Sequence, residues 1–274
     1  MAINLNKAYT NFFQGIAKFP RFKSKPDKQS IQYPQNVTVK NDLLCVPKIG
    51  EIQAVFHREI TGIIKTVTIS KTPSDKYFAS ILCETEDSYC PDSGNKTLGI
   101  DLGLKDFAIV HDGEQVTKYS NPKHLKRHAK NLARKQQKLA RKTKGSKTRE
   151  RYRKLVAKVH ERVSNTRQDF LHKLSRKLVD ESQVIAVENL NTKGMVRNRK
   201  LSKAISDVGW GIFVNFLTYK LERKEGKLVE IDRFFPVLKS VHAVVMWSIN
   251  CRLISGSGIV LSVELIMTVT VMLH

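Results

Sequence analysis

The feature that most constrains the fold is a carboxylate between two glycines inside an apolar stretch, at residues 97–110. Gly99 and Gly103 flank Asp101, and apolar residues run on both sides of this group. The pattern predicts a buried strand, a tight turn and a second strand that returns beside the first. Asp101 would then lie at the end of a rigid strand, although an aspartate there can also simply begin a turn.

A second apolar stretch, residues 183–190, also ends on a carboxylate, Glu188. Two acids at the ends of central strands supply the hard oxygen ligands that Mg²⁺ prefers, with positions left over for water and phosphate. The pair therefore predicts a metal-dependent nuclease site in which Asp101 and Glu188 are both the metal ligands and the catalytic residues.

Net charge indicates the class of partner. The chain has 274 residues, 41% of them hydrophobic, which is enough for a real core in one large domain or two ordinary ones. Lys and Arg number 48 against 25 Asp and Glu, a formal charge of +23. Such an excess favours a polyanionic partner, with nucleic acid as the first candidate.

A long helical insertion between the two acidic strands carries most of this charge. Apolar residues recur at helical spacing on both sides of residues 143–147, which predicts a helical hairpin. Residues 123–177 hold 21 Lys or Arg against 3 Asp or Glu, whereas a solvated helix face normally mixes signs. We expect contacts to nucleic-acid phosphates from Lys130, Arg134, Lys138, Arg141, Arg151, Lys154, Lys158 and Arg162.

Short apolar runs with turn signals between them occupy residues 30–83 and predict about five strands of a small β-barrel or sheet. Before them, residues 1–29 mix aromatic and basic side chains, which would suit either base stacking or a short loop packed by phenylalanines. After Glu188, residues 191–203 are polar and basic and suggest a mobile loop near the acids. Residues 210–221 place four apolar side chains on one helical face, and residues 227–231 predict one more strand.

Cysteine usage and the chain ends bear on the compartment. Cys45, Cys83, Cys90 and Cys251 lie far apart without a Cys-x-x-Cys pair, so we interpret them as reduced thiols. The first residues lack the apolar core of a signal peptide, which favours a cytoplasmic protein. Residues 253–274 are apolar, but Glu264 at their centre disfavours a membrane anchor, and we expect no membrane partner.

Three motifs in order resemble the TnpB family, OrfB-type proteins of bacterial insertion sequences that are related to type V CRISPR effectors. They are Gly99-Ile100-Asp101-Leu102-Gly103, then Val187-Glu188-Asn189-Leu190, then Arg233-Phe234-Phe235-Pro236. Upstream segments agree with the likeness, which covers roughly residues 10–236. They are residues 19–25, residues 57–60 and residues 68–73.

The resemblance implies a transposon-encoded, RNA-guided DNA endonuclease, formerly called a transposase. Its fold would be α/β, with a ribonuclease H-like (RuvC-type) core that carries the long basic helical hairpin and follows a small β-barrel. Asp101 and Glu188 would hold Mg²⁺, and the hairpin would grip guide RNA and target DNA by the backbone. The expected domains are a partial nucleic-acid-binding barrel (1–90) and the nuclease domain (95–236) with its insertion (121–181).

Two departures from the family stand out. Members of the family begin earlier, with a strand and a helical module, and they continue past the Phe-Phe-Pro motif. That continuation has two Cys-x-x-Cys pairs for zinc and an Asp-Arg-Asp whose last acid completes the metal site. Residues 237–274 contain neither element. Some codons that encode these residues would, in a shifted reading frame, encode both the Cys-x-x-Cys pairs and Asp-Arg-Asp. We therefore interpret residues 237–274 as an out-of-frame tail.

With the third carboxylate and the zinc site missing, we expect nucleic-acid binding to survive better than cleavage. The chain would be an impaired or inactive nuclease. The alternative is a non-catalytic nucleic-acid-binding relic, which uses the same basic surface without a metal-dependent reaction.

Overall fold

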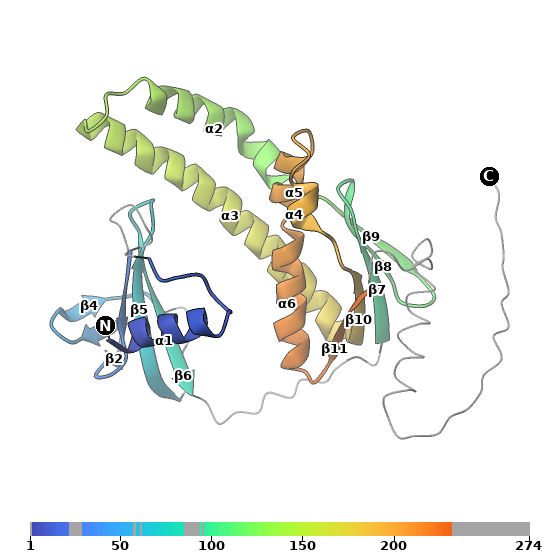
Figure 1. The fold of residues 1–274 in the computed structure, drawn as a ribbon, viewed down its shortest axis with the longest axis horizontal. Coiled ribbons are helices and arrows are strands. Elements are labelled where there is room, and N and C mark those ends of the chain that lie inside the picture. The colour runs from blue at the N-terminus through green and yellow to red at the C-terminus, as the bar shows by residue number, and fades with distance from the viewer. Residues whose placement is uncertain are drawn as a thin grey trace. The chain divides into compact units, whose positions relative to one another are not determined.

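A computed structural model describes residues 2–21, 29–56, 59–60, 62–84, 94 and 96–231. The chain divides into two compact units, and each draws on the helical insertion (Figure 1). The first unit is Met1–Ser88 with Arg134–Glu161, and the second is Tyr89–Ala133 with Arg162–His274. The expected out-of-frame tail, the rejected membrane anchor and the Arg233–Pro236 motif lie outside the described residues.

The first unit contains two antiparallel three-stranded sheets around one apolar core. One has the order β1-β5-β6 and the other β2-β3-β4. Leu44 and Val46 of one sheet and Val67 of the other are almost fully buried in the shared core. The strands are β1 (Gln29–Tyr33), β2 (Thr38–Lys40), β3 (Leu43–Val46), β4 (Gly50–Gln53), β5 (Ile63–Lys71) and β6 (Tyr77–Glu84).

The expected strands are confirmed, and β1 adds a strand at the start of the series. Over the described residues, however, backbone hydrogen bonds form two open sheets and no closed barrel. The N-terminal segment also differs from expectation, because it begins with helix α1 (Ala2–Phe13). Phe19 packs edge-on against Tyr9 and Phe12 of this helix. Packing by a phenylalanine is thus present, but against a helix and not within a short loop.

The second unit is built on one five-stranded mixed sheet of order β11-β10-β7-β8-β9. The parallel centre, β10 between β7 and β11, comes from segments far apart in sequence, whereas β7, β8 and β9 form an antiparallel meander. The strands are β7 (Lys96–Leu102), β8 (Asp106–His111), β9 (Val116–Ser120), β10 (Ser182–Glu188) and β11 (Lys227–Ile231).

One face of this sheet is covered by helices α3 (Lys147–Glu181) and α6 (Trp210–Glu222). The ring of Phe107 meets Phe170 of α3 and Phe213 of α6 edge-on, with centroids 5.1 and 5.0 Å away. The strands contribute alternate residues to this core: Leu98, Ile100, Leu102, Ala108, Val110, Ile185 and Val187. The predicted apolar face of α6 is confirmed as buried core: Trp210, Phe213, Leu217 and Leu221.

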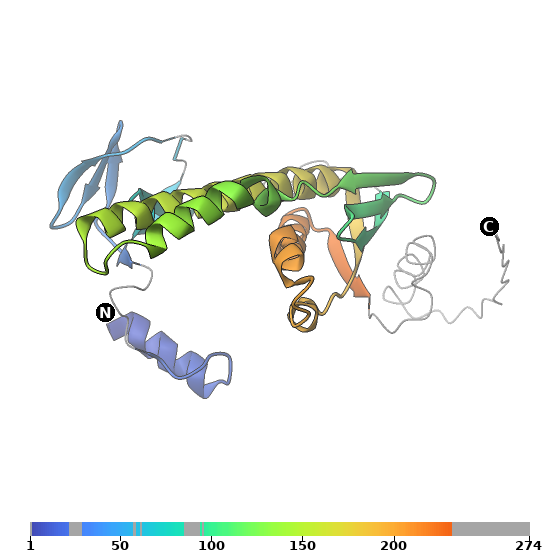
Figure 2. The same cartoon turned by 90° about the horizontal axis from the view of Figure 1, so that it is seen from above.

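The predicted helical hairpin is also confirmed, as α2 (His124–Ala140) and α3 run alongside each other (Figures 1 and 2). The Arg149 guanidinium closes its tip by donating to the carbonyls of Leu139 and Lys142. The expected loop at residues 191–203 is partly wrong, because it contains the short helix α4 (Thr192–Met195), and α5 (Ser202–Val208) begins within it. Asn191 caps α4 by accepting a hydrogen bond from the Gly194 backbone.

Candidate metal centre and basic helical surface

Asp101 and Glu188 end up on neighbouring strands at the same level of the sheet. The parallel register pairs Ala186 with Gly99 and Val187 with Ile100, so the next step brings Glu188 beside Asp101. Equivalent residues on adjacent strands point to the same face. The structure therefore brings together the two side chains that the sequence predicted as metal ligands.

This shared face is opposite to the one packed by α3 and α6. Ile100 and Val187, the residues just before the two acids, belong to the helix-covered core. Side chains alternate along a strand, so the acids point away from that core. Asp101 is exposed and Glu188 is half-buried, and the preceding residues on their face are the small Gly99 and Ala186. The carboxylates are thus open to a ligand from solution.

The turn after Asp101 needs a glycine at position 103. A Cβ placed there would lie 2.8 Å from the Asp106 carbonyl oxygen, which is closer than real Cβ contacts allow. The Gly103 backbone also donates to the Phe107 carbonyl, and this hydrogen bond closes the turn. The glycine after the acid is therefore a requirement of the hairpin that ends β7 just beyond Asp101.

Burial and a charged neighbour both disfavour the ionised form of Glu188. Burial raises the pKa of Glu188 above its ordinary value, and the negative charge of Asp101 raises it further. Over the described residues, neither acid forms an ion pair with a Lys, Arg or His. A divalent cation would relieve this repulsion, and carboxylate oxygens are the ligands it prefers. Among the residues that the structure describes, no group of three or more His, Cys, Asp or Glu side chains is arranged to hold a metal ion.

The predicted phosphate contacts line the two long helices. Seven of the eight side chains are exposed, and Lys154 is half-buried. Lys154 donates to Asp75 in the β5–β6 turn at 2.6 Å, so it already has a carboxylate partner within the chain. The exposed members are Lys130, Arg134, Lys138, Arg141, Arg151, Lys158 and Arg162. The hairpin thus presents a row of cations, with one of the predicted residues committed to holding the fold.

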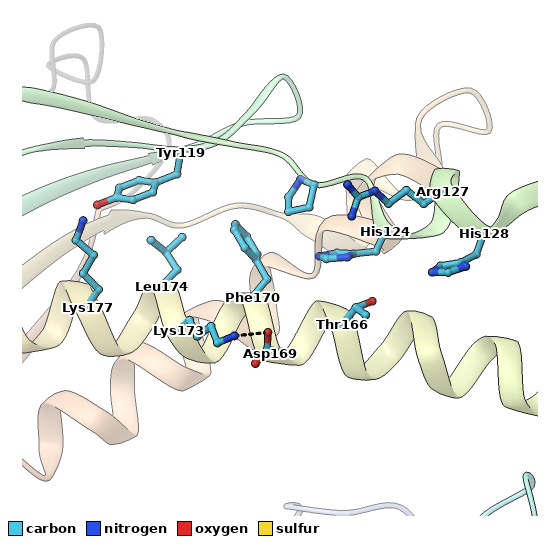
Figure 3. Close-up of a pocket in the computed structure, with 11 residues that line it drawn as sticks. Tyr119, His124, Arg127, His128, Thr166, Asp169, Phe170, Lys173, Leu174 and Lys177 are labelled. Atoms are coloured by element: carbon cyan, nitrogen blue, oxygen red, sulfur yellow. Dashed lines mark hydrogen bonds and ion pairs between the residues drawn. The ribbon is translucent and has the colours of Figure 1, made fainter.

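The structure also contains a pocket that the sequence analysis did not anticipate (Figure 3). Its walls are the segment from Tyr119 to His128 and one face of α3 from Thr166 to Lys177. Its α3 wall includes Asp169, Phe170, Lys173 and Lys177, at helical spacing that could have indicated a shared face. The pairing of that face with a segment about 40 residues earlier had no signal in the sequence.

Among the described residues, no helix is long and apolar enough to cross a membrane.

These features define a class: a mixed α/β protein with a strand-end carboxylate pair and a basic helical hairpin between the two acidic strands. The OrfB_IS605 family, described as "Probable transposase", matches residues 80–199, which include Asp101, the hairpin and Glu188. The chain belongs to this TnpB family, as its motifs indicated.

Individual relatives agree with this assignment. A Streptomyces pristinaespiralis protein whose curated name proposes an RNA-guided DNA endonuclease is 37% identical over 86% of this chain and 59% of its own length. InsQ of Escherichia coli K12, with the same proposed activity in its name, is 29% identical over 83% of this chain and 60% of its own. The TnpB-like protein L770 of Acanthamoeba polyphaga mimivirus is 23% identical over 84% and 46%.

Solved structures give a weaker likeness. A complex of Cas12f1 with sgRNA and target DNA aligns with 84% of this chain and 60% of that chain, at 10% identity and a TM-score of 0.47. This chain spans about three fifths of the length of the first two curated relatives.

Proposed function

We propose that this chain is a TnpB-like protein that binds guide RNA and DNA and carries a RuvC-type site for metal-dependent phosphodiester cleavage. The observation that supports it most is that two carboxylates without a basic partner lie side by side at the ends of β7 and β10. In this proposal the five-stranded sheet is the ribonuclease H-like core, and the two sheets of the first unit are its partial nucleic-acid-binding barrel.

The donor set fits a magnesium ion. Asp101 and Glu188 offer hard oxygens on one face, and burial, followed by the negative charge of Asp101, raises the pKa of Glu188. When bound there, such an ion supplies an activated water and stabilises the leaving oxygen of a phosphodiester. The contribution of the chain is to hold both carboxylates on a rigid sheet and to keep basic side chains from neutralising them.

Nucleic acid would be held by the hairpin. The exposed Lys and Arg of α2 and α3 meet phosphates without reading bases, so sequence recognition would be left to pairing with a guide strand. Binding by this surface does not depend on the carboxylate pair. A cytoplasmic location follows from such partners.

Cleavage would be weak or absent in this form. Two carboxylates define fewer coordination positions than the three of the family, and both ion affinity and geometry suffer from the loss. We attribute the missing acid and the missing zinc site to a frame change near the Pro236 codon. Sequencing the gene around codons 236–240 tests this, because codons that cannot encode the four cysteines in another frame would contradict it.

The decisive experiment combines binding and cleavage. The purified chain is expected to bind DNA and RNA in a strongly salt-dependent manner, with at most slow Mg²⁺-dependent nicking of DNA. Any nicking should vanish in Asp101→Ala and persist in Glu230→Gln, whose carboxylate lies on the adjacent strand β11 at the level of Val187. Nicking that survives Asp101→Ala would contradict the proposed site.

The alternative, a non-catalytic binding relic, shares the basic surface and predicts the same salt dependence. It differs in the carboxylates, because it gives Asp101 and Glu188 no ion to hold. Calorimetric titration with Mg²⁺ separates the two. If the natural chain gives a heat of Mg²⁺ binding and Glu188→Gln does not, the metal site is supported. If neither protein gives a heat of binding, the non-catalytic relic is supported.

A further inference from the structure

The pocket beside the start of α2 has the size of a small-ligand site. Its volume is about 450 Å³, inside the range of roughly 300–1,000 Å³ that is typical of such sites. All of its walls belong to the second unit of the chain. Figure 3 shows Phe170 and Leu174 along its middle, between Lys177 toward one end and Arg127 toward the other, and Pro122 also lines the pocket.

The charged groups leave the pocket positive. Lys173 is paired with Asp169 at 2.8 Å, so this acid is already used. Lys177 lies over the ring of Tyr119, 5.5 Å from its centroid. Within the described residues, neither Lys177 nor Arg127 forms an ion pair with a carboxylate. Two free cations therefore flank an apolar middle.

The walls of the pocket are held in place by groups behind them. Asp207 of α5 is buried and accepts hydrogen bonds from the Leu125 backbone at 2.8 Å and from the Arg167 guanidinium at 3.0 Å. These two contacts tie the start of α2 to α3. Asn121 also donates to the Leu104 carbonyl and accepts from the Lys123 backbone. The pocket is therefore formed before any ligand arrives.

One polar atom at the pocket is left without a partner. The Nε2 atom of His124 is buried and has no hydrogen bond to any described residue. Its ring lies against Phe170, with centroids 6.0 Å apart, and burial lowers the pKa of the imidazole. Buried polar atoms in proteins almost always have a partner. Because this atom is covered, a ligand group would exchange a hydrogen bond with neutral His124 after a small shift of the side chains around it.

We propose that this pocket receives one unstacked nucleotide of a bound single strand. The base would contact Pro122, Phe170 and Leu174 and reach His124, and the phosphates on its two sides would meet Arg127 and Lys177. This inference rests on the proposed nucleic-acid-binding function and adds a defined position at which one base, not only the backbone, contributes to affinity.

A host strand with a single base isolates that contribution. The probes are an eight-residue abasic DNA strand and the same strand with one central thymidine, measured by fluorescence anisotropy at fixed salt. Phosphate contacts are the same in both probes, so the difference reports the base. In the natural chain the thymidine is expected to strengthen binding by about tenfold, the usual scale of one base in an aromatic site.

Two tryptophan variants test the location. Thr166 lines the pocket, so Thr166→Trp should fill the cavity without changing charge and abolish the effect of the thymidine. Gln168, two residues further along α3, is exposed and outside the pocket, so Gln168→Trp should leave the effect intact. Arg127→Ala should weaken both probes more than Lys126→Ala, which removes the same charge from the neighbouring position outside the pocket.

A crosslink on the natural chain makes the test independent of variant folding. A strand with a single 5-iodouracil should attach on irradiation to the peptide that contains Tyr119 or Phe170. Equal affinity for both host strands, or crosslinks confined to other peptides, would overturn the pocket assignment. If a 20-base-pair duplex still binds in that case, the proposed function stands, whereas a chain that binds no nucleic acid refutes both.

Discussion

Carboxylates in two regions of this molecule meet opposite surroundings. In the β5–β6 turn, Asp75 lies between two lysines, 2.7 Å from Lys71 and 2.6 Å from Lys154. Hydrogen bonds from Lys154 and then Lys71 lower the pKa of Asp75 to about 2. At the ends of β7 and β10, Glu188 has Asp101 as its charged neighbour, and its pKa is raised.

The difference is informative because this chain has 48 basic residues for 25 acidic ones. Basic partners are abundant, and carboxylates such as Asp75, Asp180 and Asp207 have them. Two adjacent acids without such a partner cost electrostatic free energy, and the packing of the sheet does not require acidic residues at these positions. The comparison supports the proposal that the strand-end pair binds a cation from solution, whereas the turn carboxylate connects β5 and β6 to α3.

The largest expected effect comes from the most buried of the paired carboxylates. Asp207→Ala should lower the free energy of unfolding by about 3 kcal/mol, because it leaves the Arg167 charge and the Leu125 N–H without their acceptor. Urea denaturation measures the loss, with Asp207→Asn as the control that keeps one oxygen. A loss below about 1 kcal/mol would show that paired carboxylates in this chain are not structural.

Magnesium should distinguish the two regions next most clearly. At ten times its dissociation constant, Mg²⁺ is expected to stabilise the natural chain by about 1.4 kcal/mol through mass action. Thermal denaturation with and without Mg²⁺ measures this shift. Asp101→Asn and Glu188→Gln should lose it, and Asp75→Asn should keep it. Equal shifts in all four proteins would place the ion elsewhere.

Without metal, removing the charge of Glu188 should stabilise the protein. Because its pKa is higher in the folded chain than in the unfolded one, the native state favours its protonated form. The contribution of Glu188 to stability is therefore most favourable below its pKa in the unfolded chain, and it is lost as the pH rises through its pKa in the folded chain. At pH 7, Glu188→Gln should melt about 1–3 °C higher than the natural chain. A lower melting temperature for Glu188→Gln than for the natural chain would refute the proposal that the charge of Glu188 destabilises the folded state.

The smallest effect belongs to the exposed turn. Asp75 is ionised in the folded chain down to pH about 2, so its stabilising contribution is present above its unfolded pKa of about 4 and is lost as the pH falls through the folded value. Asp75→Asn should therefore differ slightly from the natural chain at pH 6 and converge with it in acid. Melting curves from pH 6 to pH 2 provide the measurement, and a difference that grows in acid would contradict the assignment.

Local patterns were enough for many elements. The helical hairpin, the buried face of α6 and the strands around Asp101 and Glu188 follow from periodicity, turn residues and composition, which act over a few neighbouring residues. Helix α1 was missed although Leu5, Ala8, Tyr9 and Phe12 recur at helical spacing, and the short helix α4 was missed because its four residues form no apolar stripe. Tertiary contacts and a side-chain cap define them instead.

The sequence by itself determined that two acids would end buried strands and that a basic hairpin would lie between them. Only the tertiary structure decided that β10 pairs with β7 in the register that puts Glu188 beside Asp101, and on the face away from the helices. It also decided that Lys154 is used by Asp75 and that residues 119–128 and 166–177 enclose a pocket. Register and long-range contacts depend on how whole elements pack, and packing is a property of the folded chain.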